Sequence, residues 1–410
     1  MKTALVLSGG GARGAYQMGV YKALKKQKID ISIITGTSIG ALNGCMFVQG
    51  DYKKALKMWN NLSFSSVMED ASGVDLRTLK GKTELFSKYI KALINEGGFE
   101  IDKIEATVKN AFNPYKFYSS NIDFGLVTVR LSDLKPVMLT KKDLKQDKII
   151  DYLVASSAIF PAFQKKKIDD QVFIDGGYYD NLPIELAIKM GAEKIIAVDL
   201  DVVGRKKTVK SDVDMTYIKP ISKLGNFLDF DKDEAKRSMI IGYNDAMKAF
   251  QKYEGKKYTF KKRHIYYNAL AYEENFQKNL NEFVKFKTPI GNQVKKSYYK
   301  KYFDEDYSKY VLDILDYIGT TFDVCDEEVY GVFKFNNQVR TKFSKIHRVE
   351  SKRINSLIDK ERIENPMDKK ILIKHIYNYL EKGDFDNLNV FAAIFPNEYV
   401  AAIYLYTIYH

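Results

Sequence analysis

The sequence predicts an α/β fold in the first half of the chain and a largely helical region in the second half. Short apolar runs that indicate buried strands alternate with helix-like runs, and each of the first two strands ends in a glycine-rich turn. Strands are expected at 4–8, 31–34, 124–131, 136–140, 172–174 and 194–199, and helices at 16–25, 41–47, 142–157 and 183–190. Further helices are expected at 51–61, 83–95, 306–318, 352–364, 368–381 and 398–409.

A glycine loop, Gly9-Gly10-Gly11-Ala12-Arg13-Gly14, joins the first strand to the first helix. Backbone N–H groups at a helix start suit a phosphate or the oxyanion of an acyl-transfer intermediate. The glycines also fit the dinucleotide fingerprint G-x-G-x-x-G, which requires an acidic residue at the end of the second strand. That strand ends in Thr35-Gly36-Thr37-Ser38, and Asp30 lies at its other end. The dinucleotide interpretation therefore lacks its second requirement.

The second strand leads into Gly36-Thr37-Ser38-Ile39-Gly40, a pattern typical of a nucleophile elbow. The flanking glycines are expected because a side chain at either position would collide with the neighbouring strand or helix. A serine hydroxyl needs a base to take its proton, and the usual base is histidine. The first histidine in the chain is His264. Either Ser38 is inert or its base is a carboxylate.

Asp175 is the best carboxylate candidate, because it follows the apolar run 172–174 and precedes Gly176-Gly177. We expect it at the carboxyl end of a strand, as Ser38 is, and in open α/β sheets chemistry gathers at such ends. A free aspartate has a pKa of about 3.9, so desolvation would have to raise it for general-base catalysis. The alternative is that Asp175 only begins a turn, since Asp-Gly is a common turn signal.

Taken together, four blocks in order resemble the patatin-like phospholipases. They are the glycine loop, the elbow, Ala155-Ser156-Ser157-Ala158-Ile159-Phe160-Pro161, and Asp175-Gly176-Gly177 followed by Asn181-Leu182-Pro183-Ile184-Glu185-Leu186-Ala187. The resemblance covers roughly residues 1–204. It implies a three-layer α/β/α fold with a mostly parallel central sheet, and hydrolysis of acyl esters, typically glycerophospholipids, without metal or cofactor. The third block lacks the Pro-Gly insertion of many family members, which bears on the shape of the acyl pocket.

The resemblance also implies roles for individual residues. Ser38 would be the nucleophile and Asp175 the base of a Ser–Asp dyad, with the N–H groups of Gly10, Gly11 and Ala12 forming the oxyanion hole. The supporting residues would be Gly9, Arg13, Gly14, Gly36, Gly40, Gly176 and Gly177. The alternative function is a non-hydrolytic protein that binds a nucleotide or an anionic head group through the glycine loop. That alternative predicts that Ser38→Ala leaves the main activity intact.

The length of 410 residues allows two domains. We expect a catalytic domain over residues 1–204 and a mixed, mainly helical region of unknown role over 205–410. That second region is far larger than the fold requires, so we expect it to cover the site or to sense an activator. Within it, the apolar tail 390–409 predicts a buried helix pair, with membrane adhesion or partner docking as the alternative.

The net charge of +13 predicts attraction to anionic membrane lipid, with generic solubility as the alternative. Lys165-Lys166-Lys167 follows Phe160 and Phe163, and basic charge beside aromatic side chains suits a membrane interface. Nucleic acid is a poor fit, because no recognised motif accompanies the charge.

A cytoplasmic location, with peripheral membrane contact, is expected from three further observations. The two cysteines, Cys45 and Cys325, fit a reducing compartment. The N-terminus lacks a signal-peptide core, and no run of about 18 apolar residues occurs.

The sequence shows no metal-ligand spacing. Asp199 and Asp201 are interpreted as loop acids, and the histidines are isolated from one another.

Overall fold

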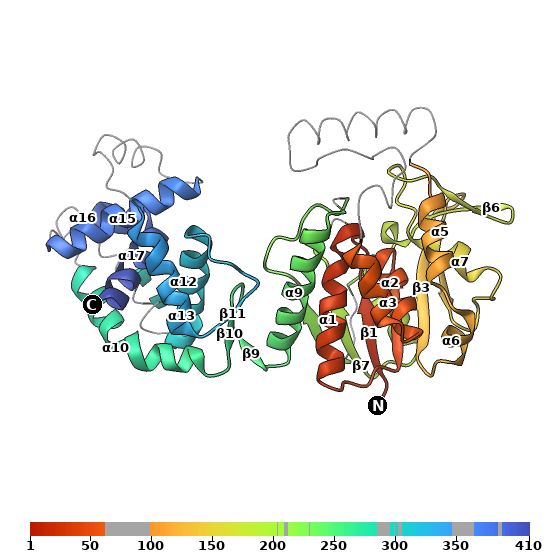
Figure 1. The fold of residues 1–410 in the computed structure, drawn as a ribbon, viewed down its shortest axis with the longest axis horizontal. Coiled ribbons are helices and arrows are strands. Elements are labelled where there is room, and N and C mark those ends of the chain that lie inside the picture. The colour runs from red at the N-terminus through yellow and green to blue at the C-terminus, as the bar shows by residue number, and fades with distance from the viewer. Residues whose placement is uncertain are drawn as a thin grey trace. The chain divides into compact units, whose positions relative to one another are not determined.

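The computed structural model divides the chain into two compact units, Met1–Ala249 and Phe250–His410 (Figure 1). It describes residues 1–61, 99–202, 204–208, 212–228, 230–284, 296–298, 300–301, 306–346, 365–383 and 388–410. The helices expected at 83–95 and 352–364 lie outside the described residues.

The first unit contains an eight-stranded sheet with the order β5-β6-β3-β2-β1-β7-β8, and β4 beside β3. Its strands are β1 Thr3–Leu7, β2 Ile33–Thr37, β3 Asp123–Arg130, β4 Lys135–Thr140, β5 Lys166–Ile168, β6 Gln171–Asp175, β7 Lys194–Val198 and β8 Asp214–Ile218. Strands β3, β2, β1, β7 and β8 are parallel. β4, β6 and β5 are antiparallel to their neighbours. The expected mostly parallel sheet is confirmed.

Helices cover both faces of this sheet. Their bounds are η1 Gly11–Gly14, α1 Ala15–Lys26, α2 Ile39–Val48, α3 Tyr52–Asn60, α5 Asp102–Ala111, α6 Pro114–Ser119, α7 Ile149–Ser156, η4 Gly176–Tyr178, α8 Ile184–Lys189 and α9 Lys232–Ala249. Val6 of β1 packs with residues of α8 on one face. Leu7, the next residue, approaches Gly44 of α2 on the other. Because successive strand residues point to opposite faces, the unit has the expected α/β/α layers.

The helix expected at 142–157 begins only at Ile149, so the first half of that prediction is wrong. The carboxylate of Asp143 accepts hydrogen bonds from both the N–H and the hydroxyl of Thr140, at 2.9 and 2.7 Å. Such local bonds stabilise a turn in competition with a helix.

The first unit extends beyond residue 204 to Ala249, because β8 and α9 complete the sheet and its helical layer. Helix α9 packs closely along α1 (Figure 1). A Cβ atom at Gly242 would lie only 2.1 Å from the carbonyl oxygen of Tyr16, so glycine is needed at this crossing. The Tyr16 hydroxyl donates to Asp245 at 2.8 Å. Segment 205–249 is therefore part of the first unit.

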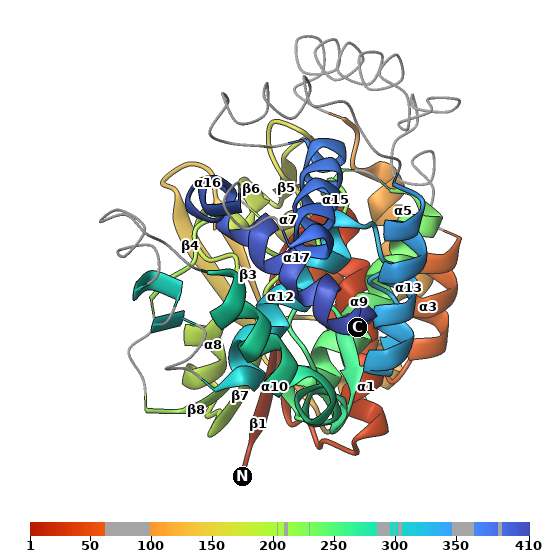
Figure 2. The same ribbon diagram turned by 90° about the vertical axis from the view of Figure 1, so that its left-hand side faces the viewer.

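The second unit is mainly helical, as Figure 2 shows. Its elements are β9 Tyr253–Glu254, β10 Thr259–Lys261, α10 His264–Phe283, α12 Tyr307–Thr321, β11 Val329–Tyr330, α13 Val332–Ser344, α15 Pro366–Lys382, α16 Leu388–Ile394 and α17 Pro396–Tyr409. Residues 398–405 of α17 are all buried, as expected for a helix that is apolar on every side. The buried-helix interpretation of the tail is therefore confirmed for α17, whereas α16 is only partly buried, with Val390 49% exposed. Among the described residues, no helix has the length and apolar character needed to cross a bilayer.

Candidate active site

Ser38 lies in a tight turn between β2 and α2. Its backbone has φ 56° and ψ −129°, which is a rare conformation for a residue with a side chain. A Cβ at Gly40 would lie 2.3 Å from the carbonyl oxygen of Leu7, and one at Gly36 would lie 2.4 Å from the carbonyl group of Gly40. The predicted strand–serine–helix turn is present, and both glycines are required by close backbone contacts.

Asp175 reaches Ser38 because two strands share one edge of β3. Strand β4 occupies one edge of β3. On the other edge, β2 pairs with the first part of β3 and ends with Thr37 opposite Val127. β6 pairs with the last part of β3 in the antiparallel direction and ends with Asp175 opposite Thr128. The carboxyl ends of β2 and β6 therefore meet. The expectation from open parallel sheets is wrong on this point, because the antiparallel direction of β6 relative to β3 is what brings the two residues together.

The Asp175 side chain is buried, with 3% of its surface exposed. Its Oδ1 accepts the N–H of Gly177 at 2.6 Å. Its Oδ2 lacks a well-aligned hydrogen bond within the part of the chain that the structure describes. Burial raises the pKa of Asp175 to about 7, against the hydrogen bonds from Ser38 and Gly177, which lower it. The carboxylate is thus a stronger base than a free aspartate, and it lies beside the Ser38 hydroxyl.

Asn181 connects the glycine loop to the turn after Asp175. Its backbone carbonyl accepts the N–H of Gly9 at 3.1 Å, and its side-chain amide donates to the Gly9 carbonyl at 3.4 Å. The Asn181 Oδ1 atom fills the space that a Cβ at Gly9 or Gly177 would need. These contacts explain why glycine occurs at both positions.

The Ala12 N–H, which we predict as an oxyanion donor, is already engaged. It donates to the carbonyl oxygen of Phe227 at 2.8 Å. The same oxygen would lie 2.2 Å from a Cβ at Gly11, so it sits directly against the loop. The Phe227 carbonyl must move before Ala12 can bind an oxyanion, and Gly10 and Gly11 remain the predicted donors.

Arg13 supports the loop through backbone carbonyl groups. Its Nε donates to Gly225 at 2.8 Å, and its Nη1 donates to Asp201 at 2.7 Å and Leu200 at 3.3 Å. The guanidinium group therefore ties the glycine loop to the segments that follow β7 and β8. This arrangement agrees with the supporting role that the resemblance implies for Arg13.

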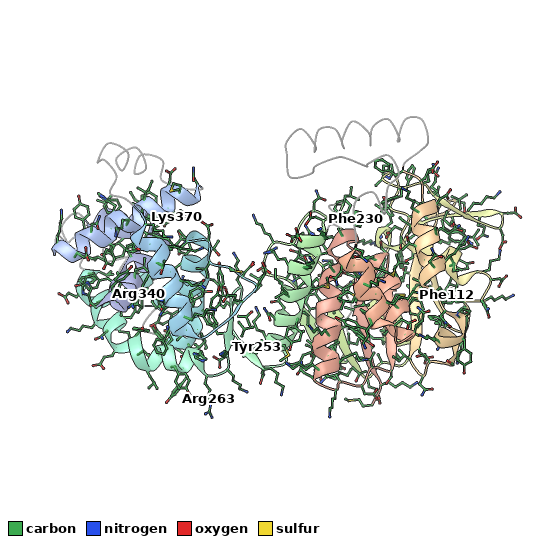
Figure 3. The ribbon with its side chains drawn as sticks, in the orientation of Figure 1. Phe112, Phe230, Tyr253, Arg263, Arg340 and Lys370 are labelled. Atoms are coloured by element: carbon green, nitrogen blue, oxygen red, sulfur yellow. The ribbon has the colours of Figure 1, made fainter. Side chains whose placement is uncertain are left out.

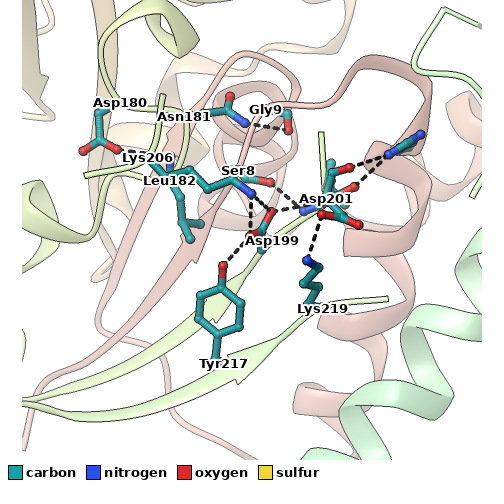
Figure 4. A network of polar contacts seen from close by, with 12 residues as sticks. Ser8, Gly9, Asp180, Asn181, Leu182, Asp199, Asp201, Lys206, Tyr217 and Lys219 are labelled. Atoms are coloured by element: carbon teal, nitrogen blue, oxygen red, sulfur yellow. Dashed lines mark hydrogen bonds and ion pairs between the residues drawn. The ribbon is translucent and has the colours of Figure 1, made fainter. Parts of the chain in front are cut away.

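Asp199 and Asp201 are ion-paired in a polar network next to the loop (Figure 4). Lys206 donates to both carboxylate oxygens of Asp199, at 2.8 and 2.7 Å, and Tyr217 donates to the same carboxylate. Lys219 pairs with Asp201 at 2.8 Å. Burial acts to raise the pKa of Asp199, but the hydrogen bonds from Lys206 and Tyr217 outweigh it and hold the pKa below its usual value. The pairings agree with the interpretation of both as loop acids.

A cavity of about 300 Å³ opens at Ser38 and is lined mainly by apolar side chains. Its lining includes Leu42, Met46, Met58, Trp59, Val108, Phe112, Phe163, Phe227, Leu228 and Phe230, of which Phe112 and Phe230 are labelled in Figure 3. Cys45 also contacts the cavity, but burial raises the pKa of its thiol, so it stays protonated. An apolar cavity beside a serine hydroxyl can accommodate the acyl chain of an ester.

Sequence reasoning assigned no role to three residues that contact the site. Ser156 accepts the backbone N–H of Ser38 at 3.0 Å, and Asn181 holds the glycine loop. Both lie in the sequence blocks that resemble the patatin-like phospholipases, and this position is the signal that could have identified them. Phe227 lies in no motif, so no local pattern pointed to it.

The first unit is thus a three-layer α/β/α domain whose serine elbow opens onto an apolar cavity. Residues 5–188 match the family model "Patatin-like phospholipase". Over this segment, which is less than half of its length, the chain is similar to the patatin-like phospholipases.

Relatives with this domain are much longer than the matched segment. Patatin-like phospholipase domain-containing protein 7 of Rattus norvegicus is 29% identical over 202 residues, which are 48% of this chain and 13% of the relative. Lysophospholipase NTE1 of Mycosarcoma maydis is 27% identical over 201 residues, or 49% of this chain and 10% of the relative. Among solved structures, VipD from Legionella pneumophila aligns over 99% of this chain and 90% of that one, with 14% identity and a TM-score of 0.35.

Proposed function

We propose that the chain hydrolyses acyl esters of lipids, with Ser38 as nucleophile and Asp175 as base. The observation that carries the proposal is the buried Asp175 carboxylate beside the elbow serine. The pKa of Asp175, about 7, suits proton transfer at neutral pH. The first unit contains no histidine, since the first in the chain is His264. Asp175 therefore takes the role that histidine has in a triad.

The proposed reaction has two steps. Ser38 Oγ attacks the ester carbonyl carbon while its proton moves to Asp175, and the oxyanion is stabilised by the N–H groups of Gly10 and Gly11. The intermediate collapses, and the leaving alcohol takes the proton from Asp175. Water then gives a proton to Asp175 and attacks the acyl-serine. The second collapse releases the fatty acid, and Ser38 recovers its proton.

The proposed substrate is a glycerophospholipid or lysophospholipid whose acyl chain occupies the apolar cavity. The name of the fungal relative, a lysophospholipase, supports this class. A neutral glyceride presents the same ester and acyl chain, so the assay compares all three.

We also propose peripheral contact with anionic membranes through two of the three lysines at 165–167. Lys166 points inward, where it pairs with Glu105 at 2.5 Å and Asp151 at 3.0 Å. Lys165 and Lys167 are exposed, as the two-residue period of a strand requires. The Lys165 ammonium also lies 4.9 Å from the centre of the Phe160 ring, which combines charge with an aromatic surface.

Vesicle binding tests the membrane proposal. Lys165→Glu with Lys167→Glu should weaken binding to vesicles that contain anionic lipid. The matched control is Lys261→Glu with Lys262→Glu, which changes the net charge equally at two exposed lysines of the second unit. Equal loss in both double variants would show that binding follows net charge alone.

Fluorophosphonate labelling, read by peptide mass spectrometry, tests the catalytic proposal without a choice of lipid. We expect labelling at Ser38 that is strongly slowed in Asp175→Asn, together with fatty-acid release that Ser38→Ala abolishes. An unlabelled wild-type protein would refute the proposed chemistry. Head-group or nucleotide binding that persists in Ser38→Ala would then favour the non-hydrolytic alternative.

A further inference from the structure

Ser156 forms a buried hydrogen-bonded link between the nucleophile elbow and the central sheet. Its side chain is fully buried at the end of α7. The hydroxyl oxygen accepts the backbone N–H of Ser38 at 3.0 Å, and the hydroxyl donates to the carbonyl oxygen of Val127 at 2.7 Å. One hydroxyl group therefore satisfies two buried backbone groups from different elements.

This link acts on a residue whose backbone conformation is unfavourable. Ser38 has a positive φ, and such a conformation persists only where the surroundings hold it. Ser38 also precedes α2, and the first N–H groups of a helix have no acceptor within the helix. Ser156 supplies that acceptor. The orientation of the Ser38 peptide, and hence the direction of its side chain, depends on this hydroxyl.

The same segment also holds the proposed base. The carbonyl oxygen of Ala158 accepts the backbone N–H of Asp175 at 2.9 Å. Asp175 pairs with Thr128, the residue after the Val127 that accepts from Ser156. Residues 156–158 thus contact both members of the Ser–Asp pair and the strand between them.

The neighbouring serine shows that this contact is specific to one position. The hydroxyl of Ser157, the residue that follows α7, donates to the carbonyl of Leu153 in that helix at 3.1 Å. Of these two adjacent serines, Ser156 is the one whose hydroxyl reaches across to the elbow.

We infer that Ser156 is a positioning residue that fixes the Ser38 hydroxyl relative to the Asp175 carboxylate. The inference rests on the proposed function, because it assigns a role in that acyl transfer. Ser156 contacts the backbone of Ser38, and the role given to it involves no contact with substrate and no proton transfer.

The test compares Ser156→Ala with the wild-type full-length protein. We expect the rate of fluorophosphonate labelling at Ser38, and kcat for a soluble chromogenic ester, to fall on the order of 100-fold, because small misplacements of reacting groups have effects of this size. KM should change little, since the apolar cavity is intact. The midpoint of the pH profile should also stay near that of the wild type, since Asp175 keeps its burial.

Two further variants separate positioning from loss of folding. Ser238→Ala removes another buried serine hydroxyl of the same unit, from α9, and should keep wild-type kinetics. Ser156→Cys keeps the shape of the side chain but replaces the hydroxyl with a larger sulfur that is a weak acceptor, so it provides the kinetic comparison if Ser156→Ala does not fold.

Each outcome decides the matter. A folded Ser156 variant that labels at the wild-type rate would overturn the inference, as would an equal loss of rate in Ser238→Ala. A loss expressed mainly in KM would also overturn it, because a positioning role acts on kcat. Absence of labelling and hydrolysis in the wild type would refute the proposed function and, with it, the role of Ser156.

Discussion

The raised pKa of Asp175 makes a prediction about stability that does not depend on any substrate. An unfolded aspartate has a pKa of about 3.9, whereas burial raises the pKa of Asp175 to about 7 in the folded protein. The folded state therefore holds its proton more tightly than the unfolded state. Stability from this group is fully present below the unfolded pKa, falls as the pH rises, and is lost above the folded pKa.

Asp175→Asn removes this titration and leaves the rest of the charge unchanged. Each pKa unit corresponds to about 1.36 kcal/mol, and the window from pH 5 to the folded pKa of about 7 spans roughly two units. The free energy of unfolding of the wild type, relative to the variant, should therefore fall by about 3 kcal/mol between pH 5 and pH 8. Asp180, whose pKa burial raises to about 6, contributes equally to both proteins and cancels in the difference.

Urea unfolding followed by tryptophan fluorescence measures this difference. Trp59 is the only tryptophan in the chain and is buried in the first unit, so its emission reports that unit alone. This selectivity matters because two units need not unfold in one transition. A difference between the two proteins that stays constant from pH 5 to pH 8, or that increases, would refute the assignment of a raised pKa to Asp175.

Three further predictions follow from the same geometry. The rate of fluorophosphonate labelling at Ser38 should increase with pH in a titration whose midpoint is near pH 7, because Asp175 must be ionised to accept the proton. A labelling rate that does not change with pH would contradict this role of Asp175. A fragment of residues 1–249 should unfold cooperatively by tryptophan emission, whereas one of residues 1–205 should not, since it lacks the helix that packs on α1. Gly40→Ala should cost more than about 4 kcal/mol because its Cβ meets a backbone oxygen. Gly50→Ala, whose positive φ is strained but whose surroundings are open, should cost about 1–2 kcal/mol in the same urea titration.

Much of the candidate site was predictable from the sequence because its signals are local. The alternation of apolar runs and glycines placed Ser38 at a strand–helix turn, and the close contacts at Gly36 and Gly40 show why only glycine fits there. Because no histidine occurs before His264, the base for Ser38 was predicted to be a carboxylate. Asp175 was the candidate because it lies at the end of an apolar run.

Residue types and local patterns identify the side chains that are available for chemistry, whereas the packing of distant segments brings these side chains together. Ser38 and Asp175 converge because β2 and β6 end head-on along one edge of β3, and strand pairing between distant segments leaves no local signature. Burial of Asp175 and Lys166, and contact of the Phe227 carbonyl with Ala12, likewise depend on which segments pack together. Dielectric surroundings and hydrogen-bond partners are properties of that packing, so residue type and spacing alone do not specify them.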